Sequence, residues 1–259
     1  MEEELCKSRK GQSVPKARFG RIDGKGKYRI WLSARHHCQE TMASYVLEGV
    51  LDATLSDTET GEWMRENAEL MVVPFVDLDG VVAGDQGKNR KPHDHNRDYY
   101  QFIYPETRAI RDWIAEYANW GIDAFIDLHC PWVHGEFEEI VFQVYGPVEA
   151  AIPAQMKFGD ILEGCQDGSL AYRRSQDFPW NFRWNSDKNY KAGACGSRKW
   201  AMQNLKKTRL ATTFEIPFAN ANGKVVDAQS ARRFGRDMAK ALVKFLKEEP
   251  RVLDLGKKE

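Results

Sequence analysis

The sequence predicts an α/β protein in which helices cover both faces of a mixed, mostly parallel, twisted sheet. Apolar runs of strand length alternate along the chain with segments of helical periodicity, as expected for parallel strands joined by helices. Strands that alternate with helices imply a mostly parallel sheet that is covered on both faces. The 259 residues show no repeat, linker or break in composition, so we expect a single domain over 1–259.

The first part of the chain predicts two strands and one helix. Residues 1–26 are polar and rich in Gly and Lys, and we expect them to be loosely ordered. YRIWLSARH at 28–36 predicts a buried strand, and LMVVPFV at 70–76 predicts a second one. Residues 40–55 carry apolar side chains at helical spacing, whereas residues 56–66 are polar and turn-like.

The middle of the chain begins with a long loop. Residues 77–101 contain Gly, Asn, Asp and His with little periodicity, and a loop of that length inside a compact domain is usually functional. A proline suits the first turn of a helix over 105–120. DAFIDLH at 123–129 and EEIVFQVYG at 138–146 predict two strands, and a helix is expected over 152–164.

The last part of the chain completes the alternation. Residues 166–200 are irregular, aromatic and rich in Gly. TRLATTFEIPF at 208–218 predicts a further strand, and 226–248 predicts a long closing helix.

Charge and cysteine content argue against several classes of protein. The chain has 38 Lys and Arg against 38 Asp and Glu, and a net charge of zero argues against a nucleic-acid partner. The five cysteines are widely spaced with no CxxC pair, so we expect free thiols and a cytoplasmic location rather than a disulfide framework. The first residues contain no apolar run, and no stretch approaches the length of a membrane span, so we expect neither a signal peptide nor a membrane partner.

His37 and Glu40 form a candidate metal-binding pair at the end of the strand predicted over 28–36. A His and a carboxylate three residues apart can lie on one side of a turn and bind one ion. His36 lies four residues from Glu40 and is an alternative ligand. A surface pair near the start of a helix is the alternative interpretation.

His129 is a further candidate ligand because it ends the apolar strand AFIDLH. Ligands of open α/β sheets gather at the carboxyl ends of strands. A lone histidine there is more often a hydrogen-bonded core residue. With His37 and Glu40, however, it makes a set of two nitrogens and one carboxylate, which leaves open the fourth position that catalytic zinc requires.

Glu215 is the candidate general base. It lies in TTFEIPF, and burying a carboxylate among strand residues is unfavourable unless the group is paired or functional. The sequence therefore predicts either a structural ion pair or a base that takes a proton from an attacking water molecule.

The loop stretch Asp94-His95-Asn96-Arg97 is a candidate substrate-binding segment. Arg97 can hold a carboxylate through two hydrogen bonds, and Asn96 adds an amide donor. Asp94 could orient a metal-binding imidazole. A solvated loop is the alternative interpretation.

Taken in order, these segments resemble the zinc carboxypeptidases of the carboxypeptidase A type, and especially their cytosolic branch. An HxxE pair is followed by a DxNR stretch, a strand ending in His, and a strand carrying Glu. FVDLDG resembles the family's Asn-Pro-Asp-Gly turn, with Asp77 and Leu78 in place of Asn and Pro. The resemblance covers 28–218 and implies that family's fold. At its amino end we expect the chain to be shorter than the family, which usually has another strand and helix there.

The resemblance implies an enzyme that removes the C-terminal residue from a peptide or protein tail. It implies one zinc ion per chain, bound by His37, Glu40 and His129. Glu215 would activate the water molecule.

The same resemblance implies roles in substrate binding. Asn96 and Arg97 would hold the terminal carboxylate, and Arg90 is the nearest candidate for the family's arginine that polarises the scissile carbonyl. Tyr190 resembles the family's mobile tyrosine. Arg198, in GSRKW, takes the position at the base of the pocket for the terminal side chain. An arginine there favours a carboxylate, which predicts a preference for terminal Glu or Asp.

Two other functions remain open. An acylamino-acid deacylase of the aspartoacylase type shares the HxxE and later His ligands, although the tyrosine followed by GSRKW favours the peptidase. A non-catalytic binding module with the same fold is the second alternative, and the presence of Glu215 argues against it.

Overall fold

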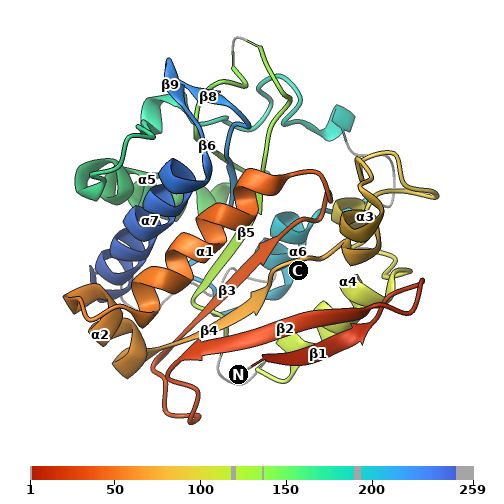
Figure 1. Ribbon diagram of the computed structural model, residues 1–259, viewed down its shortest axis with the longest axis horizontal. Helices are drawn as coiled ribbons and strands as arrows, with labels where there is room; N and C mark the ends of the chain where they lie inside the picture. Colours follow the sequence, from red (N-terminus) through yellow and green to blue (C-terminus); the bar gives the residue numbers. More distant parts are fainter. Residues whose placement is uncertain (1, 118–120, 136, 190–193, 249–259) are drawn as a thin grey trace.

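A seven-stranded sheet forms the centre of the computed structural model, which describes residues 2–117, 121–135, 137–189 and 194–248 (Figure 1). The strands are β1 (Glu2–Lys7), β2 (Ser13–Gly20), β3 (Tyr28–Ala34), β4 (Ala68–Val73), β5 (Ala124–His129), β6 (Phe142–Val144) and β7 (Leu210–Glu215). Their order across the sheet is β1-β2-β4-β3-β5-β7-β6. Neighbours among β4, β3, β5 and β7 are parallel, whereas β1, β2 and β6 pair antiparallel. The predicted mixed, mostly parallel sheet is confirmed.

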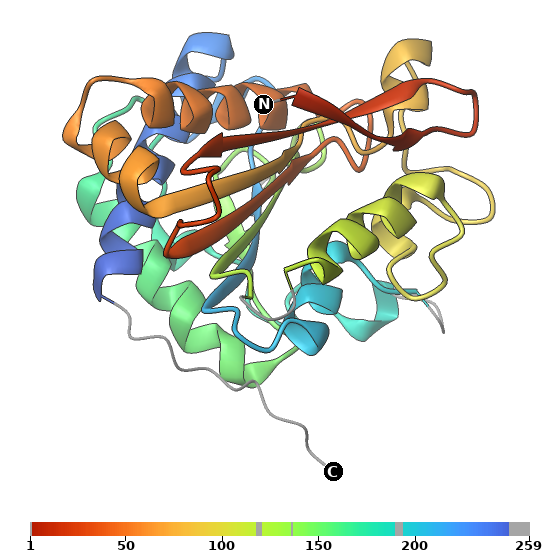
Figure 2. The same cartoon turned by 90° about the horizontal axis from the view of Figure 1, so that it is seen from below.

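Helices lie on both faces of this sheet. They are α1 (Thr41–Leu55), α2 (Glu59–Asn67), α3 (Leu78–Ala83), α4 (Pro105–Ala115), α5 (Ile152–Cys165), α6 (Ser197–Asn204) and α7 (Ala228–Glu248). A small hairpin consists of β8 (Asn220–Ala221) and β9 (Lys224–Val225). Figure 2 shows α1, α5 and α7 on one side of the sheet and α4 and α6 on the other. No helix within the described ranges is long and apolar enough to cross a membrane.

The central strand β3 contributes to two separate cores. Ile30 and Leu32 lie in the core that includes the buried faces of α1 and α7. Trp31 points to the opposite face, where its ring lies 5.9 Å from Phe125 and 5.5 Å from Trp113 of α4. Burial on both faces explains why this strand is apolar at consecutive positions.

The amino-terminal segment differs from the prediction. Residues 1–26 were expected to be loosely ordered, but they form β1 and β2, and β2 pairs with β4. Val14 is fully buried. Arg18 pairs with Glu69 of β4, with 3.3 Å between Nη1 and Oε1. Such cross-strand charge pairs make an edge strand look like a polar tail in the sequence.

Short elements also replace parts of the predicted loops. Residues 56–66 contain most of α2, which begins where the Thr58 hydroxyl accepts a hydrogen bond from the backbone N–H of Gly61. The long loop contains α3, and 166–200 contains the start of α6. The strand expected over 138–146 shrinks to β6. Helices of one to three turns carry too few residues for a clear periodic signal.

Candidate metal centre and active site

The carboxyl ends of three parallel strands bring the predicted site residues together. In the register between β5 and β7, His129 lies beside Glu215. In the register between β3 and β5, Ala34 lies beside Leu128, so the residues that follow β3 reach the same edge. Open parallel sheets commonly bind ligands at this edge.

The turn after β3 is fixed by Arg35. The backbone of this residue has a φ of 62°, which is unusual for any residue other than glycine. Its Nε donates a hydrogen bond of 2.7 Å to the carbonyl of Cys38. The turn places Glu40 directly before α1, where the helix dipole favours a negative charge.

His37, Glu40 and His129 form a compact, buried group of ligand atoms. The Nδ1 atoms of His37 and His129 each lie 2.8 Å from a different carboxylate oxygen of Glu40. One ligand atom from each residue lies within 4.8 Å of the others. Two imidazole nitrogens and one carboxylate are a common set for catalytic zinc, which would replace these hydrogen bonds. The residues therefore fit the metal, although their role as ligands stays a prediction.

The charges of this group depend strongly on one another. Burial raises the pKa of Glu40, but the charges of His37 and His129 outweigh burial and hold it well below its usual value. Burial lowers the pKa of His129, whereas Asp127 and Glu40 raise it well above its usual value. Metal binding would displace protons from these histidines and would therefore be favoured by higher pH.

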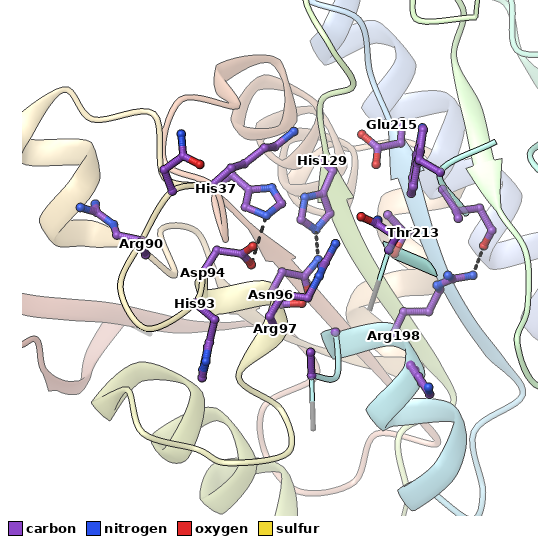
Figure 3. A pocket seen from close by; sticks show the side chains of 18 of the residues that line it. His37, Arg90, His93, Asp94, Asn96, Arg97, His129, Arg198, Thr213 and Glu215 are labelled. Atoms are coloured by element: carbon purple, nitrogen blue, oxygen red, sulfur yellow. Dashed lines mark hydrogen bonds and ion pairs between the residues drawn. The ribbon is translucent and has the colours of Figure 1, made fainter. Parts of the chain in front are cut away.

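Two further carboxylates hold the outer nitrogens of the imidazoles. Asp94 Oδ1 lies 3.4 Å from Nε2 of His37 (Figure 3). Asp127 Oδ2 lies 2.7 Å from Nε2 of His129. Such partners fix the orientation of a ligand ring and raise its basicity. Sequence reasoning anticipated Asp94 and missed Asp127, although a carboxylate inside the buried strand AFIDLH was an available signal.

His36, the alternative to His37, is held on both ring nitrogens. Its Nδ1 lies 2.9 Å from Asp127, and its Nε2 lies 2.7 Å from the hydroxyl of Tyr99. His36, Asp127 and His129 also bring ligand atoms within 4.8 Å of one another. His36 and Asp127 are fully buried, however, so an ion among them would not be accessible to a substrate.

Glu215 faces the same cavity as His37 and His129. It is only 8% exposed, and its Oε2 has no hydrogen-bond partner among the residues that the structure describes. The pKa of Glu215 is raised to about 7, mainly by burial and also by the nearby Glu40 carboxylate, although the charges of His129 and Lys88 partly oppose this rise. A buried carboxyl with a raised pKa in a cleft is typical of a functional group.

A cavity of about 720 Å³ connects these residues with the loop 88–97 and the start of α6. Lys88 reaches into the site, with its Nζ 3.1 Å from Glu40 Oε1. The same ammonium lies 5.4 Å from the ring centroid of Trp132. Sequence reasoning missed Lys88, because nothing in its local pattern distinguishes it from other lysines of the loop.

Arg90, the candidate for polarising the scissile carbonyl, pairs with two carboxylates. It lines the cavity, but its Nε lies 2.9 Å from Asp77 and its Nη1 lies 2.6 Å from Asp85. Figure 3 shows Arg90 at the opposite side of the cavity from Glu215. Because two carboxylates hold its guanidinium, we do not retain Arg90 as the group that polarises a carbonyl.

The predicted carboxylate-binding residues line the cavity. The Asn96 amide nitrogen lies 3.1 Å from His129 Nε2, and its oxygen accepts a hydrogen bond of 2.9 Å from the backbone N–H of Ser197. Arg97 also lines the cavity and donates to the carbonyl of Asn96. The structure therefore brings both residues next to the candidate ligands.

Arg198 also lines the cavity and is only 5% exposed. Its guanidinium donates a hydrogen bond to the carbonyl of Val144 in β6. Arg198 lies in the first turn of α6. Figure 3 shows it on the side of the cavity away from Arg90 and His37. Tyr190 lies outside the described residues.

Comparisons with known proteins agree with this geometry. The sequence model described as "Zinc carboxypeptidase" matches residues 3–101, which include His37, Glu40 and the Asp94–Arg97 stretch. An uncharacterised protein of Zymomonas mobilis is 24% identical over 254 residues, covering 96% of this chain and 63% of the relative. Human cytosolic carboxypeptidase 1 is 30% identical over 105 residues, which are 37% of this chain and 9% of that protein.

Solved structures extend the likeness to nearly the whole chain. A metallo-carboxypeptidase from Burkholderia cenocepacia superposes with a TM-score of 0.76 at 20% identity, over 95% of this chain and 64% of that one. A metallo-carboxypeptidase from Pseudomonas aeruginosa gives a TM-score of 0.70 at 22% identity, over 95% and 65%. At such identity the likeness concerns the fold. The chain spans less than two thirds of the length of these relatives.

Proposed function

We propose that this chain, which matches the zinc carboxypeptidases in sequence over residues 3–101 and has the fold of metallo-carboxypeptidases, is a zinc-dependent carboxypeptidase. It would hydrolyse the last peptide bond of a peptide or protein tail. One observation supports the proposal more strongly than the others. The buried carboxylate of Glu215, with Oε2 unpartnered among the described residues, faces the same cavity as a His, Glu, His group.

The proposed mechanism assigns the metal to His37, Glu40 and His129, with one zinc ion per chain. When bound there, zinc supplies a Lewis acid that lowers the pKa of a water molecule. Glu215 takes a proton from the attacking water and passes it to the leaving amine. In the metal-free chain burial raises the pKa of this carboxyl to about 7, and a pKa above the usual carboxyl value favours a group that both accepts and gives a proton. The Asp94 carboxylate, whose Oδ1 lies 3.4 Å from His37 Nε2, would keep this ring in the orientation that ligation needs.

The proposed substrate binds with its terminal carboxylate against Asn96 and Arg97, which line the cavity beside His129. Arg198 would then meet the terminal side chain. An arginine that is almost fully buried in a cavity favours a carboxylate partner, because charge-assisted bidentate pairing offsets desolvation. We therefore propose a preference for peptides that end in Glu or Asp.

The deacylase alternative is not favoured, because human cytosolic carboxypeptidase 1 and two metallo-carboxypeptidase structures are among the proteins that this chain resembles. A cytoplasmic location also remains a proposal. All five cysteines are free thiols, and several relatives are named cytosolic carboxypeptidases, so a reducing compartment is consistent with both observations.

A panel of peptides tests activity and specificity together. Peptides that end in Glu, Gln, Leu or Lys, each with a free or an amidated terminus, are compared with acylated amino acids on zinc-loaded protein. We expect hydrolysis of free termini, with Glu ahead of Gln, and poor hydrolysis of amides because the Arg97 charge then lacks its partner. Equal rates on free and amidated peptides, or activity on acylated amino acids alone, would contradict the proposal.

Arg198→Leu isolates the specificity proposal. It should lower the Glu-to-Gln ratio of kcat/KM at least tenfold, since an unpaired buried charge is strongly disfavoured. Arg236→Leu is the matched control, because Arg236 is an exposed arginine on α7 that pairs only at the surface with Asp52. A wild-type preference for Leu or Lys would refute the acidic preference and leave the carboxypeptidase proposal intact.

A further inference from the structure

We propose that Lys88 is the catalytic residue that stabilises the negative charge on the scissile carbonyl oxygen. This inference rests on the proposed carboxypeptidase function. Hydrolysis of a peptide bond places charge on the carbonyl oxygen, and a donor positioned for that charge is one of the strongest sources of rate enhancement. Arg90 was predicted for this task, but Asp77 and Asp85 hold its guanidinium away from the base.

A glycine determines where Lys88 lies. Gly87 has a φ of 94°, and a Cβ atom there would lie 2.7 Å from the backbone nitrogen of Cys38 and 3.0 Å from Cα of His37. The loop therefore packs its backbone directly on the turn that carries the candidate metal ligands, which only glycine allows. The next residue, Lys88, projects its ammonium to 3.1 Å from Glu40 Oε1.

Arg90 holds the other side of the same loop. Its Nε and Nη2 atoms lie 2.9 and 2.7 Å from Asp77 Oδ2, and Asp77 itself caps α3. Gly87 and Arg90 thus fix the chain on both sides of Lys88. Because the backbone of the loop is held at two points, little backbone entropy is lost when Lys88 meets a substrate.

The position of Lys88 is suited to a substrate rather than to the metal alone. The side chain is 26% exposed and lines the cavity that Glu215 also lines. Two arginines of the cavity make other contacts: Arg97 donates to the carbonyl of Asn96, and Arg198 to the carbonyl of Val144. The ammonium also lies 5.4 Å from the ring centroid of Trp132, within the range of a cation–π contact.

The proposed step conserves atoms and charge. The water oxygen forms a bond to the carbonyl carbon, and the π electrons move to the carbonyl oxygen, where the Lys88 ammonium donates a hydrogen bond and keeps its proton. Glu215 accepts one proton of the water. When the C–N bond breaks, the amine takes that proton and then the remaining water proton, so that a carboxylate and an ammonium product leave.

Lys88→Met, Lys88→Arg and the control Lys25→Met test this role. Lys25 is exposed and does not line the cavity. We expect Lys88→Met to lower kcat by about 10²–10³-fold, as for the loss of one donor to a developing oxyanion, with KM changed less than about threefold. Lys88→Arg should recover at least tenfold of that loss, and Lys25→Met should stay within about threefold of wild type.

Two binding measurements do not depend on turnover. Zinc affinity, measured by competition with a chelator, should be equal or higher in Lys88→Met, because the Lys88 ammonium near Glu40 repels a zinc ion bound there. A phosphonate analogue of a dipeptide ending in Glu has a tetrahedral anionic centre, and its affinity should fall at least tenfold in Lys88→Met. An uncleaved dipeptide with a reduced amide bond should bind both proteins equally.

The outcomes separate the two proposals. If wild type hydrolyses peptides and Lys88→Met keeps its kcat and its phosphonate affinity, the role of Lys88 is refuted and the proposed function stands. If Lys88→Met instead loses zinc, the lysine supports the metal site and the inference is also refuted. If zinc-loaded wild type neither cleaves peptides nor binds the phosphonate, both proposals fail.

Discussion

Replacing Glu215 by Gln should slow catalysis and stabilise the metal-free protein. The carboxyl is 8% exposed, and burial raises its pKa from the usual 4.5 to about 7. The group therefore binds a proton more tightly in the folded chain than in the unfolded chain. Its contribution to the free energy of unfolding falls as pH rises from 4.5 to 7 and is constant above that. Gln keeps the shape of the side chain and removes this dependence.

The magnitude follows from the difference between the two pKa values. At about 1.4 kcal/mol per pKa unit, the ionised carboxylate destabilises the fold by about 3 kcal/mol above pH 7 and by about 1 kcal/mol at pH 5. The unfolding free energy of Glu215→Gln relative to wild type should therefore rise by roughly 2–3 kcal/mol between pH 5 and pH 8. Any desolvation of the amide is the same at each pH and cancels from this comparison.

Urea unfolding of chelator-treated protein at pH 5, 6, 7 and 8 measures this difference. Glu66→Gln is the matched control because Glu66 is exposed, and it should follow wild type at every pH. In zinc-loaded protein the effect should shrink, since a nearby cation favours the carboxylate. Turnover by zinc-loaded Glu215→Gln should fall by about 10²–10⁴-fold, the usual contribution of a general base.

Two results would refute this reasoning separately. A Glu215→Gln protein whose relative stability does not change with pH would show that the carboxylate is well solvated or paired. A variant that keeps near-normal kcat would show that another group takes the proton. Enhanced stability together with lost turnover is the combination that a functional buried base predicts.

Three other variants test the site and its surroundings. His37→Ala should lose zinc, whereas His36→Ala should largely keep it because His36 contacts Asp127 and Tyr99 instead. The metal content of both variants is measured after dialysis. Full zinc occupancy in His37→Ala would contradict the ligand assignment. Burial raises the pKa of Asp177 to about 6. Between pH 4 and pH 7, wild type should therefore lose roughly 2–3 kcal/mol of unfolding free energy relative to Asp177→Asn. Identical pH profiles of the two proteins in urea unfolding would exclude that burial effect.

The sequence predicted those parts of the molecule whose local pattern matches their final environment. β3 and β5 each carry a run of consecutive apolar residues, 30–32 and 124–126, because both faces of the sheet are covered, and their parallel pairing follows from the helices between them. His129 could be assigned to the sheet edge for the same reason. β1 and β2 could not be recognised, since their charged residues are neutralised by partners such as Glu69 that lie about 50 residues away.

The loop that carries Lys88 and Arg90 shows why sequence spacing alone could not choose between two candidate cations. Arg90 and Lys88 are two residues apart and carry the same charge, so no local pattern distinguishes them. Tertiary contacts decide between them: carboxylates 13 and 5 residues from Arg90 hold it, whereas the missing side chain of Gly87 lets the loop pack against Cys38. Because long loops take their conformation from such contacts rather than from propensity, their functional residues can be assigned only when the partners are known. A glycine that is buried in an otherwise exposed loop is then the best pointer, since it marks where the backbone touches the site.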